Sequence, residues 1–294
     1  MTSQDVRLEP SEAQSHTSFA LEQLLGYAKA AGAAEADALL VAGADTQASM
    51  RLGEIEGVER SETSDIGLRV LIGRKQAIVS TSDLSPHALK QLAERAVDMA
   101  RAAPDTPYVG LADTSELAQS WPQDLDLDDP RDISVEALQD LAIRAEESAR
   151  AVSGVTNSEG ASASASWNEV ALATSNGFSG RYRATGYSLA VSVLAGDETT
   201  GMERDYDYSS NRHFSDLLSP ERLGTSAGEK AVRRLHAKKP KSQKTTVVFD
   251  PRVGNSLIGH LAGALNGSSV ARGSSFLKDD MGEQVLPDAL SLID

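Results

Sequence analysis

The sequence has no cysteine among its 294 residues, which excludes disulfides, thiolate nucleophiles and cysteine-ligated zinc or iron–sulfur sites. Aromatic residues make up only 4%, so the core must consist mainly of Ala, Val, Leu and Ile. No uninterrupted apolar run is long enough to span a bilayer, and residues 1–10 carry no apolar segment of a secretory signal. These absences together predict a cytoplasmic protein without a membrane partner.

Positive charge is also scarce. Lys and Arg number 28 against 43 Asp and Glu, which gives a formal net charge of −15. Such a chain repels phosphate backbones and anionic lipid. The one basic stretch, residues 230–244, interleaves no Phe, Trp or Tyr that could stack on a base. We therefore expect no nucleic-acid partner.

The hydrophobic pattern predicts helices set apart from strands that are joined mainly by hairpins, which is typical of an α+β fold. Helices are expected over residues 18–31, 85–103, 134–152 and 219–235, and after Asp250-Pro251. Strands are expected over residues 36–42, 49–52, 55–60, 66–72, 76–80, 153–167, 169–174, 182–194, 202–208 and 245–249.

These elements predict three parts of the chain. Residues 1–103 form a mixed α/β subdomain with antiparallel sheets, residues 104–236 form a central α+β subdomain, and residues 244–294 begin a β-rich C-terminal domain. The chain ends within a strand-like segment, so we expect a C-terminally truncated chain.

The polar residues form no recognisable catalytic motif. The 5 histidines are scattered, and none belongs to His-Glu-x-x-His, whereas a zinc hydrolase needs about three ligands and an open position. Scattered histidines can still converge in the fold, so an unrecognised metal site is one alternative. Another is a serine hydrolase, because residues 254–259 approach Gly-x-Ser-x-Gly; however, the second glycine comes one residue late and Asp250-Pro251 places Ser256 inside a helix.

Carboxylates cluster in two places. In residues 124–129 they alternate as in a calcium loop, but the central glycine and closing glutamate are missing, which favours a solvated linker. Glu203, Asp205 and Asp207 would share one face of a strand. They could line a cleft or hold a cation, or they could form the wet side of an edge strand, which we favour.

Four short segments, at residues 65–85, 174–178, 203–207 and 247–285, follow one another in a specific order. They contain, among others, Asp65-Ile-Gly-Leu-Arg-Val, Thr174-Ser-Asn-Gly-Phe, Glu203-Arg-Asp-Tyr-Asp and Val247-Val-Phe-Asp-Pro. Together they resemble the TldD/TldE (PmbA) metallopeptidase family, from about Ala36 onward. Members of that family are considerably longer.

The resemblance implies where a metal motif would lie. Catalytic subunits of the family carry His-Glu-x-x-x-His followed by Leu-Glu-Gly, and Leu265-Asn266-Gly267 stands in the place of the latter. The two histidine positions then fall on Ile258 and Gly263, the glutamate on Gly259 and the third ligand on Asn266. Ile and Gly cannot ligate zinc, and a lone Asn amide is a poor ligand. The pattern is thus similar to the metal-free TldE (PmbA) side of the family, without catalytic or metal-binding residues.

What the resemblance implies is a subunit of a cytoplasmic heteromeric peptidase. A TldD-like subunit would hold the zinc, and this chain would complete the assembly and shape access for extended or unfolded peptides. A homodimer is the alternative assembly, and a stand-alone peptide-binding or scaffold protein is the alternative function. Candidate contacts to substrate or partner are Glu203, Asp205, Asp207, Asn266 and Arg272.

Overall fold

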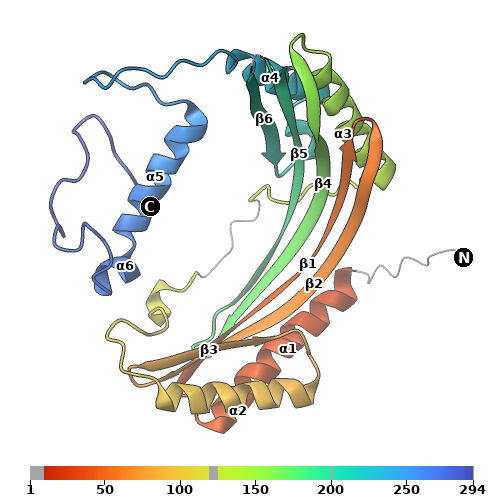
Figure 1. Cartoon of the computed structure of the whole chain (residues 1–294). Helices are drawn as coiled ribbons and strands as arrows, with labels where there is room; N and C mark the ends of the chain where they lie inside the picture. The colour runs from red at the N-terminus through yellow and green to blue at the C-terminus, as the bar shows by residue number, and fades with distance from the viewer. Residues whose placement is uncertain (1–9, 119–124, 200, 294) are drawn as a thin grey trace, which may run out of the picture. The chain divides into compact units, whose positions relative to one another are not determined.

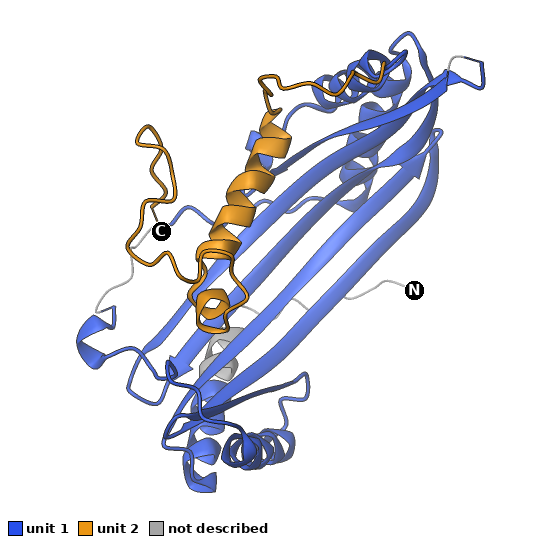
Figure 2. Cartoon of the chain, turned by 60° about the vertical axis from the view of Figure 1, so that its left-hand side comes forward, with its two compact units in different colours: residues 1–237 blue, residues 238–294 orange. Residues whose placement is uncertain are grey.

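A computed structural model describes residues 10–118, 125–199 and 201–293 (Figure 1). The chain divides into two compact units, Met1–Ala237 and Lys238–Asp294 (Figure 2). Each unit is described by itself below.

Unit 1 is built on one six-stranded antiparallel sheet with the strand order β3-β2-β1-β4-β5-β6. The strands are β1 (Glu35–Arg51), β2 (Glu54–Ile72), β3 (Lys75–Thr81), β4 (Val155–Thr174), β5 (Ser179–Asp197) and β6 (Gly201–Asn211). This sheet confirms the α+β class with antiparallel pairing. Pairing of β1 with β4 joins the strands of residues 1–103 to those of residues 104–236, so both predicted subdomains share the sheet.

Four helices accompany this sheet, and serine side chains cap three of them. They are α1 (Pro10–Ala31), α2 (Pro86–Ala102), α3 (Val135–Arg150) and α4 (Pro220–Arg233). Three helices lie where they were predicted, and the first begins at Pro10, before its predicted start at residue 18. Ser85, Ser134 and Ser219 each accept a hydrogen bond from a backbone N–H of the first turn. Short 3-10 turns lie at η1 (Thr114–Glu116) and η2 (Phe214–Asp216). Within the described residues, no helix is both long enough and apolar enough to cross a membrane.

Two hydrophobic cores lie under the same face of the sheet. Helices α1 and α2 cover one end of the strands, and α3 and α4 cover the other end (Figure 1). Strand β1 serves both cores: Ala38 and Leu40 belong to the first, and Ala48 and Met50 to the second. All four have even numbers, and alternate residues of a strand point to one face. The opposite face, which we call the open face, carries none of these four helices.

Strand β4 shows how the sequence assigns its residues to these two faces. Ala161 and Ala163 are 4% and 1% exposed and pack in the core beneath α3 and α4. Ser162 and Ser164 alternate with them and therefore lie on the open face. The small side chains of both kinds allow close packing on one side and a polar surface on the other.

The β1–β2 turn is held by a buried glutamate of α3. Leu52 and Gly53 form this turn with φ angles of 53° and 83°. The Glu146 side chain is fully buried, and its two carboxylate oxygens accept the backbone N–H groups of Leu52 and Gly53 at 2.8 and 2.9 Å. Burial alone would raise the pKa of Glu146. The hydrogen bonds from Ser158 and from both turn amides outweigh this effect, so the net result is a lowered pKa. Helix α3 and the hairpin tip are thus joined by charge-assisted hydrogen bonds.

The polar connection before α3 is more ordered than its composition predicts. Asp129 is only 9% exposed, and its carboxylate accepts the backbone N–H of Phe214 at 3.0 Å. Asp128 forms an ion pair with Arg183 at 3.1 Å. The interpretation of this stretch as solvated linker is therefore wrong for Asp129, because backbone donors satisfy its buried carboxylate. Asp124 lies outside the described residues.

Unit 2 contains α5 (Pro251–Leu265) and α6 (Gly267–Ala271). The helix predicted after Asp250-Pro251 is confirmed, and the Asp250 side chain caps it. The strand predicted over residues 245–249 is wrong for this structure, since these residues form no strand in it. A strand forms only where a neighbouring segment completes its hydrogen bonds, and the described residues supply none here. The β-rich domain expected to begin there stays a prediction.

Candidate functional site

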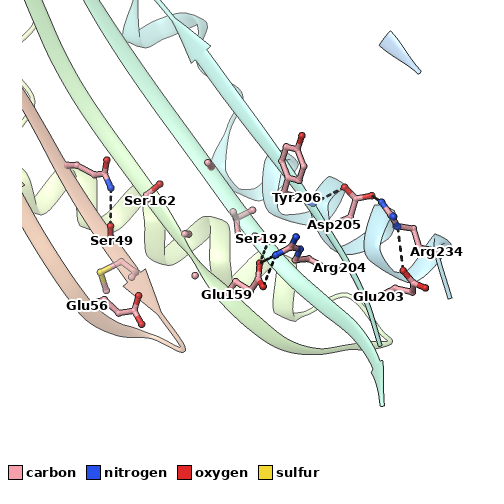
Figure 3. Close-up of a pocket in the computed structure, with 16 residues that line it drawn as sticks. Ser49, Glu56, Glu159, Ser162, Ser192, Glu203, Arg204, Asp205, Tyr206 and Arg234 are labelled. Atoms are coloured by element: carbon pink, nitrogen blue, oxygen red, sulfur yellow. Dashed lines mark hydrogen bonds and ion pairs between the residues drawn. The ribbon is translucent and has the colours of Figure 1, made fainter. Parts of the chain in front are cut away.

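The open face of unit 1 is hollowed into a groove of about 760 Å³ beside the β1–β2 hairpin (Figure 3). Five neighbouring strands contribute to its lining, in the order β2, β1, β4, β5 and β6. Arg234, which follows α4, also lines the groove. Its floor is rich in hydroxyl groups, from Ser49 of β1, Ser162 of β4 and Ser192 of β5. Ser49 and Ser162 are direct cross-strand neighbours, so the two hydroxyl groups lie side by side.

One carboxylate in this groove is held in a fixed position. The Ser192 hydroxyl donates to Glu159 Oε2 at 2.8 Å, and Arg204 Nη1 lies 3.2 and 3.3 Å from the two carboxylate oxygens (Figure 3). The Ser192 hydrogen bond, with further support from Arg204, outweighs partial burial and lowers the pKa of Glu159. Glu159 is therefore ionised near neutral pH and acts as a hydrogen-bond acceptor rather than a general acid.

The lining of the groove offers mainly hydrogen-bonding and charged groups. No histidine is among its lining residues. Ser192 does donate to a carboxylate, that of Glu159, but the lowered pKa of Glu159 makes this carboxylate a weak base for activating a serine. In the described part of the chain, no group of three or more His, Cys, Asp or Glu could hold a metal ion. Hydroxyl groups, the Gln47 amide and fixed charges remain, which suit hydrogen bonding to a polar backbone.

The acidic strand predicted from sequence is β6, which lies at an edge of the sheet as expected. Its three carboxylates do share one face, but that face packs on α4. Asp207 pairs with Lys230 at 2.7 Å, and Arg234 lies 3.4 Å from Asp205 and 3.6 Å from Glu203. Asp205 is only 6% exposed. The prediction that these carboxylates form the wet side of the strand is thus wrong for Asp205 and Asp207.

The wet side of β6 carries aromatic rings instead. Tyr206 and Tyr208 are 49% and 51% exposed, and their rings stack with centroids 6.3 Å apart. Tyr206 lines the groove. Because each tyrosine alternates with an aspartate, one strand places its charges against α4 and its rings on the open face.

The positions that correspond to the family's metal motif lie in unit 2. Ile258, Gly259 and Gly263 are on α5, and Ile258 is 53% exposed. Asn266 lies between the two helices, and its Oδ1 accepts the backbone N–H of Ser268 at 3.1 Å as the N-cap of α6. The residues present therefore do not fit a zinc ion, since only one amide is a potential ligand and its oxygen caps a helix.

Two further residues singled out from the sequence lie in the same unit. Ser256 lies within α5, as predicted, and its hydroxyl donates to the Val253 carbonyl at 2.7 Å. A strained turn after a strand would be required for a nucleophile elbow, and this serine is on a regular helix. Arg272 follows α6, and its Nη2 lies 3.4 Å from Ser268 Oγ. Its role in substrate or partner contact stays a prediction.

Three models of one family match the chain in order: PmbA/TldA metallopeptidase domain 1 over residues 36–100, the central domain over 128–235 and the C-terminal domain over 242–294. The chain belongs to the PmbA/TldD metallopeptidase family. This confirms the resemblance found in the sequence.

Two curated PmbA relatives are similar over most of the chain. Metalloprotease PmbA of Escherichia coli O157:H7 is 38% identical over 245 residues, which are 83% of this chain and 54% of that protein. The Metalloprotease PmbA homolog of Haemophilus influenzae is 36% identical over 288 residues, or 98% of this chain and 62% of that protein. The chain therefore spans between about half and two thirds of the length of these PmbA proteins.

Solved structures of low identity share the fold. A candidate modulator of DNA gyrase from Bacteroides thetaiotaomicron has a TM-score of 0.84 at 24% identity and covers 92% of this chain and 62% of its own. TldE from Thermococcus kodakarensis has a TM-score of 0.60 at 17% identity and covers 72% and 47%. At these identities the likeness establishes a common fold and nothing finer.

The groove of unit 1 was not predicted from the sequence. Alternating Ser and Ala in residues 161–166 indicate a strand with one polar face, and this pattern could have pointed to the groove floor. Glu159 and Ser192 are far apart in sequence and meet only through the β4–β5 register.

Proposed function

We propose that this chain is a PmbA/TldE-like, non-catalytic subunit of a TldD/TldE-type zinc metallopeptidase complex in the cytoplasm. A TldD-like subunit supplies the zinc and the catalytic residues. The present chain completes the assembly and shapes access for extended or unfolded peptides.

The observation that carries this proposal is the set of side chains at the motif positions of α5. Ile258, Gly259 and Gly263 have no atom that could ligate zinc, and the Asn266 oxygen caps α6. A subunit with this set contributes structure and contacts, and the chemistry belongs to another chain. The groove of unit 1 supports a role in holding peptides, because its hydroxyl groups and ionised Glu159 match the polar groups of an extended backbone.

The test is peptide hydrolysis by the full-length gene product with zinc, alone and mixed with a TldD-like protein from the same genome. We expect hydrolysis only in the mixture, together with a heteromeric species in size-exclusion chromatography. Hydrolysis by this chain alone would overturn the proposal. Absence of any complex and of any stimulation would instead favour a stand-alone binding or scaffold protein.

A matched pair of variants sharpens this test. Asn266→Trp removes the N-cap of α6 and places a bulky ring beside Gly267, so it is expected to block assembly or hydrolysis. Asn266→Asp keeps an oxygen that caps the same amides and is expected to leave both intact. If Asn266→Trp assembles and hydrolyses peptide as well as Asn266→Asp and the wild type do, this region is excluded from substrate and partner contact.

A further inference from the structure

The sheet of unit 1 has two edges that differ in how their backbone groups are used. On the β6 edge, the N–H groups of Tyr206 and Tyr208 donate to the carboxylates of the preceding Asp205 and Asp207, at 2.8 and 3.1 Å. Lys230 and Arg234 of the α4 region hold these two carboxylates in place. Both amides are therefore engaged within the chain, and a further strand could not use them without breaking these bonds.

The other edge is different. Strand β3 pairs with β2 only over residues 66–72 of β2, whereas β1 pairs with β2 from residue 54 onward. Residues 54–65 of β2, the β2 edge segment, therefore have a partner strand on one side only in the described structure. About half of the N–H and C=O groups of such a strand point away from its single partner. Among the described residues, no backbone–backbone hydrogen bond outside the strand pairing involves this segment.

Exposure and charge characterise this segment. Every residue in it is exposed except Gly57 and Ser64, and even Ile55 is 57% exposed. The segment contains five carboxylates and one basic residue, Arg60, which pairs with Glu62 at 2.9 Å. The carboxylates are Glu54, Glu56, Glu59, Glu62 and Asp65.

We propose that the β2 edge segment is a docking site for a cationic, extended peptide, which adds to the sheet as a further strand. Main-chain hydrogen bonds to an exposed edge supply affinity in this mode, and side chains next to the edge supply selectivity. The proposal concerns this chain alone and does not depend on the proposed subunit function.

The negative charge of the β2 edge segment determines which kind of strand can bind there. A second copy of the chain would place carboxylates opposite carboxylates, and like charges directly opposite each other destabilise a strand pair. An acidic partner is disfavoured for the same reason, whereas lysines or arginines at alternate positions gain favourable cross-strand pairs. The acidic residues thus prevent self-association along this edge and leave it available to a basic strand.

The test uses the 294-residue chain and a capped, fluorescent peptide of about ten alternating Lys and Val residues, which is the upper end of the usual strand length. Binding is followed by anisotropy near physiological salt, and amide hydrogen exchange locates the protected residues. We expect saturable binding with protection confined to the β2 edge segment. The same peptide N-methylated along one edge keeps its charge but loses its donors, and it is expected to bind at least tenfold more weakly.

Charge-reversal variants complete the experiment. Glu59→Lys/Asp65→Lys changes two exposed carboxylates of the segment and should weaken binding roughly tenfold. Glu94→Lys/Glu147→Lys makes the same change in net charge on exposed helix positions and should have little effect. The proposal would be overturned if the unmodified peptide did not bind, or if the N-methylated peptide bound as tightly as the unmodified one. It would also be overturned if both double variants lost the same affinity, or if the peptide protected amides of β6 instead.

Discussion

Replacing Glu146 with Gln tests whether the carboxylate of α3 stabilises the β1–β2 turn. Gln keeps one oxygen, but its NH₂ group would face the second turn amide, so the N–H of Leu52 or Gly53 loses its acceptor. Hydrogen bonds to charged groups contribute about 1.5–3 kcal/mol each, and a buried unsatisfied donor costs about 1–3 kcal/mol. Relief from burying a charge offsets part of this loss. We therefore expect the free energy of unfolding to fall by about 2–4 kcal/mol.

The assay is denaturant unfolding with the neighbouring substitution Glu147→Gln as control. Glu147 follows Glu146 on the same helix but is exposed, so the control should change stability by less than about 0.5 kcal/mol. Because the folded state lowers the pKa of Glu146, its contribution is complete above the ordinary value of 4.5 and is lost as the pH falls through the folded pKa. The difference between wild type and Glu146→Gln should thus narrow below about pH 4.5. Equal effects of both substitutions, or a difference that does not change with pH, would refute this account.

Two further substitutions test packing and backbone strain. A Cβ at Gly224 would lie 2.1 Å from the Ala145 carbonyl oxygen, so Gly224→Ala should lower the free energy of unfolding by about 3 kcal/mol. Gly26 has open space around it, so the control Gly26→Ala should raise the free energy of unfolding slightly. Thermal or urea melts of both variants check this. Leu52→Asn should raise the free energy of unfolding by about 1 kcal/mol, because Leu52 has a positive φ in an exposed turn where Asn is preferred; a lower melting temperature would contradict this.

Most elements of unit 1 could be predicted from the sequence because their signals are local. Serine caps and apolar stripes mark the helices, and alternation marks the strands. The sequence pattern breaks β1 into two strands at residues 43–48, where Gly43 and Asp45 interrupt the apolar alternation. In the structure β1 continues, because β2 and β4 pair with it on both sides throughout this stretch. Pairing is a non-local property, and the same reason explains why residues 245–249 form no strand.

The candidate site was less predictable than the fold. The absence of zinc ligands at Ile258 and Asn266 could be predicted from the sequence, because it depends only on which side-chain atoms can ligate a metal. The role of Glu203 and its neighbours required the position of α4, which turned a supposedly wet face into an ion-paired one. Glu146 lies next to another glutamate in an ordinary helical pattern, and nothing local distinguishes the buried residue from the exposed one.

The long strands shared by both cores have a consequence for how unit 1 comes apart. Homology divides this region at residues 100–128, yet β1 supplies side chains to both cores, and so does β4. Opening either end exposes the backbone of strands that the other end still needs. The two homology segments should therefore melt as one cooperative transition, and a fragment of residues 128–235 would keep β4 without the strand that covers its edge. In this fold, the boundaries of the homologous segments therefore differ from the boundaries of the unit that can fold independently.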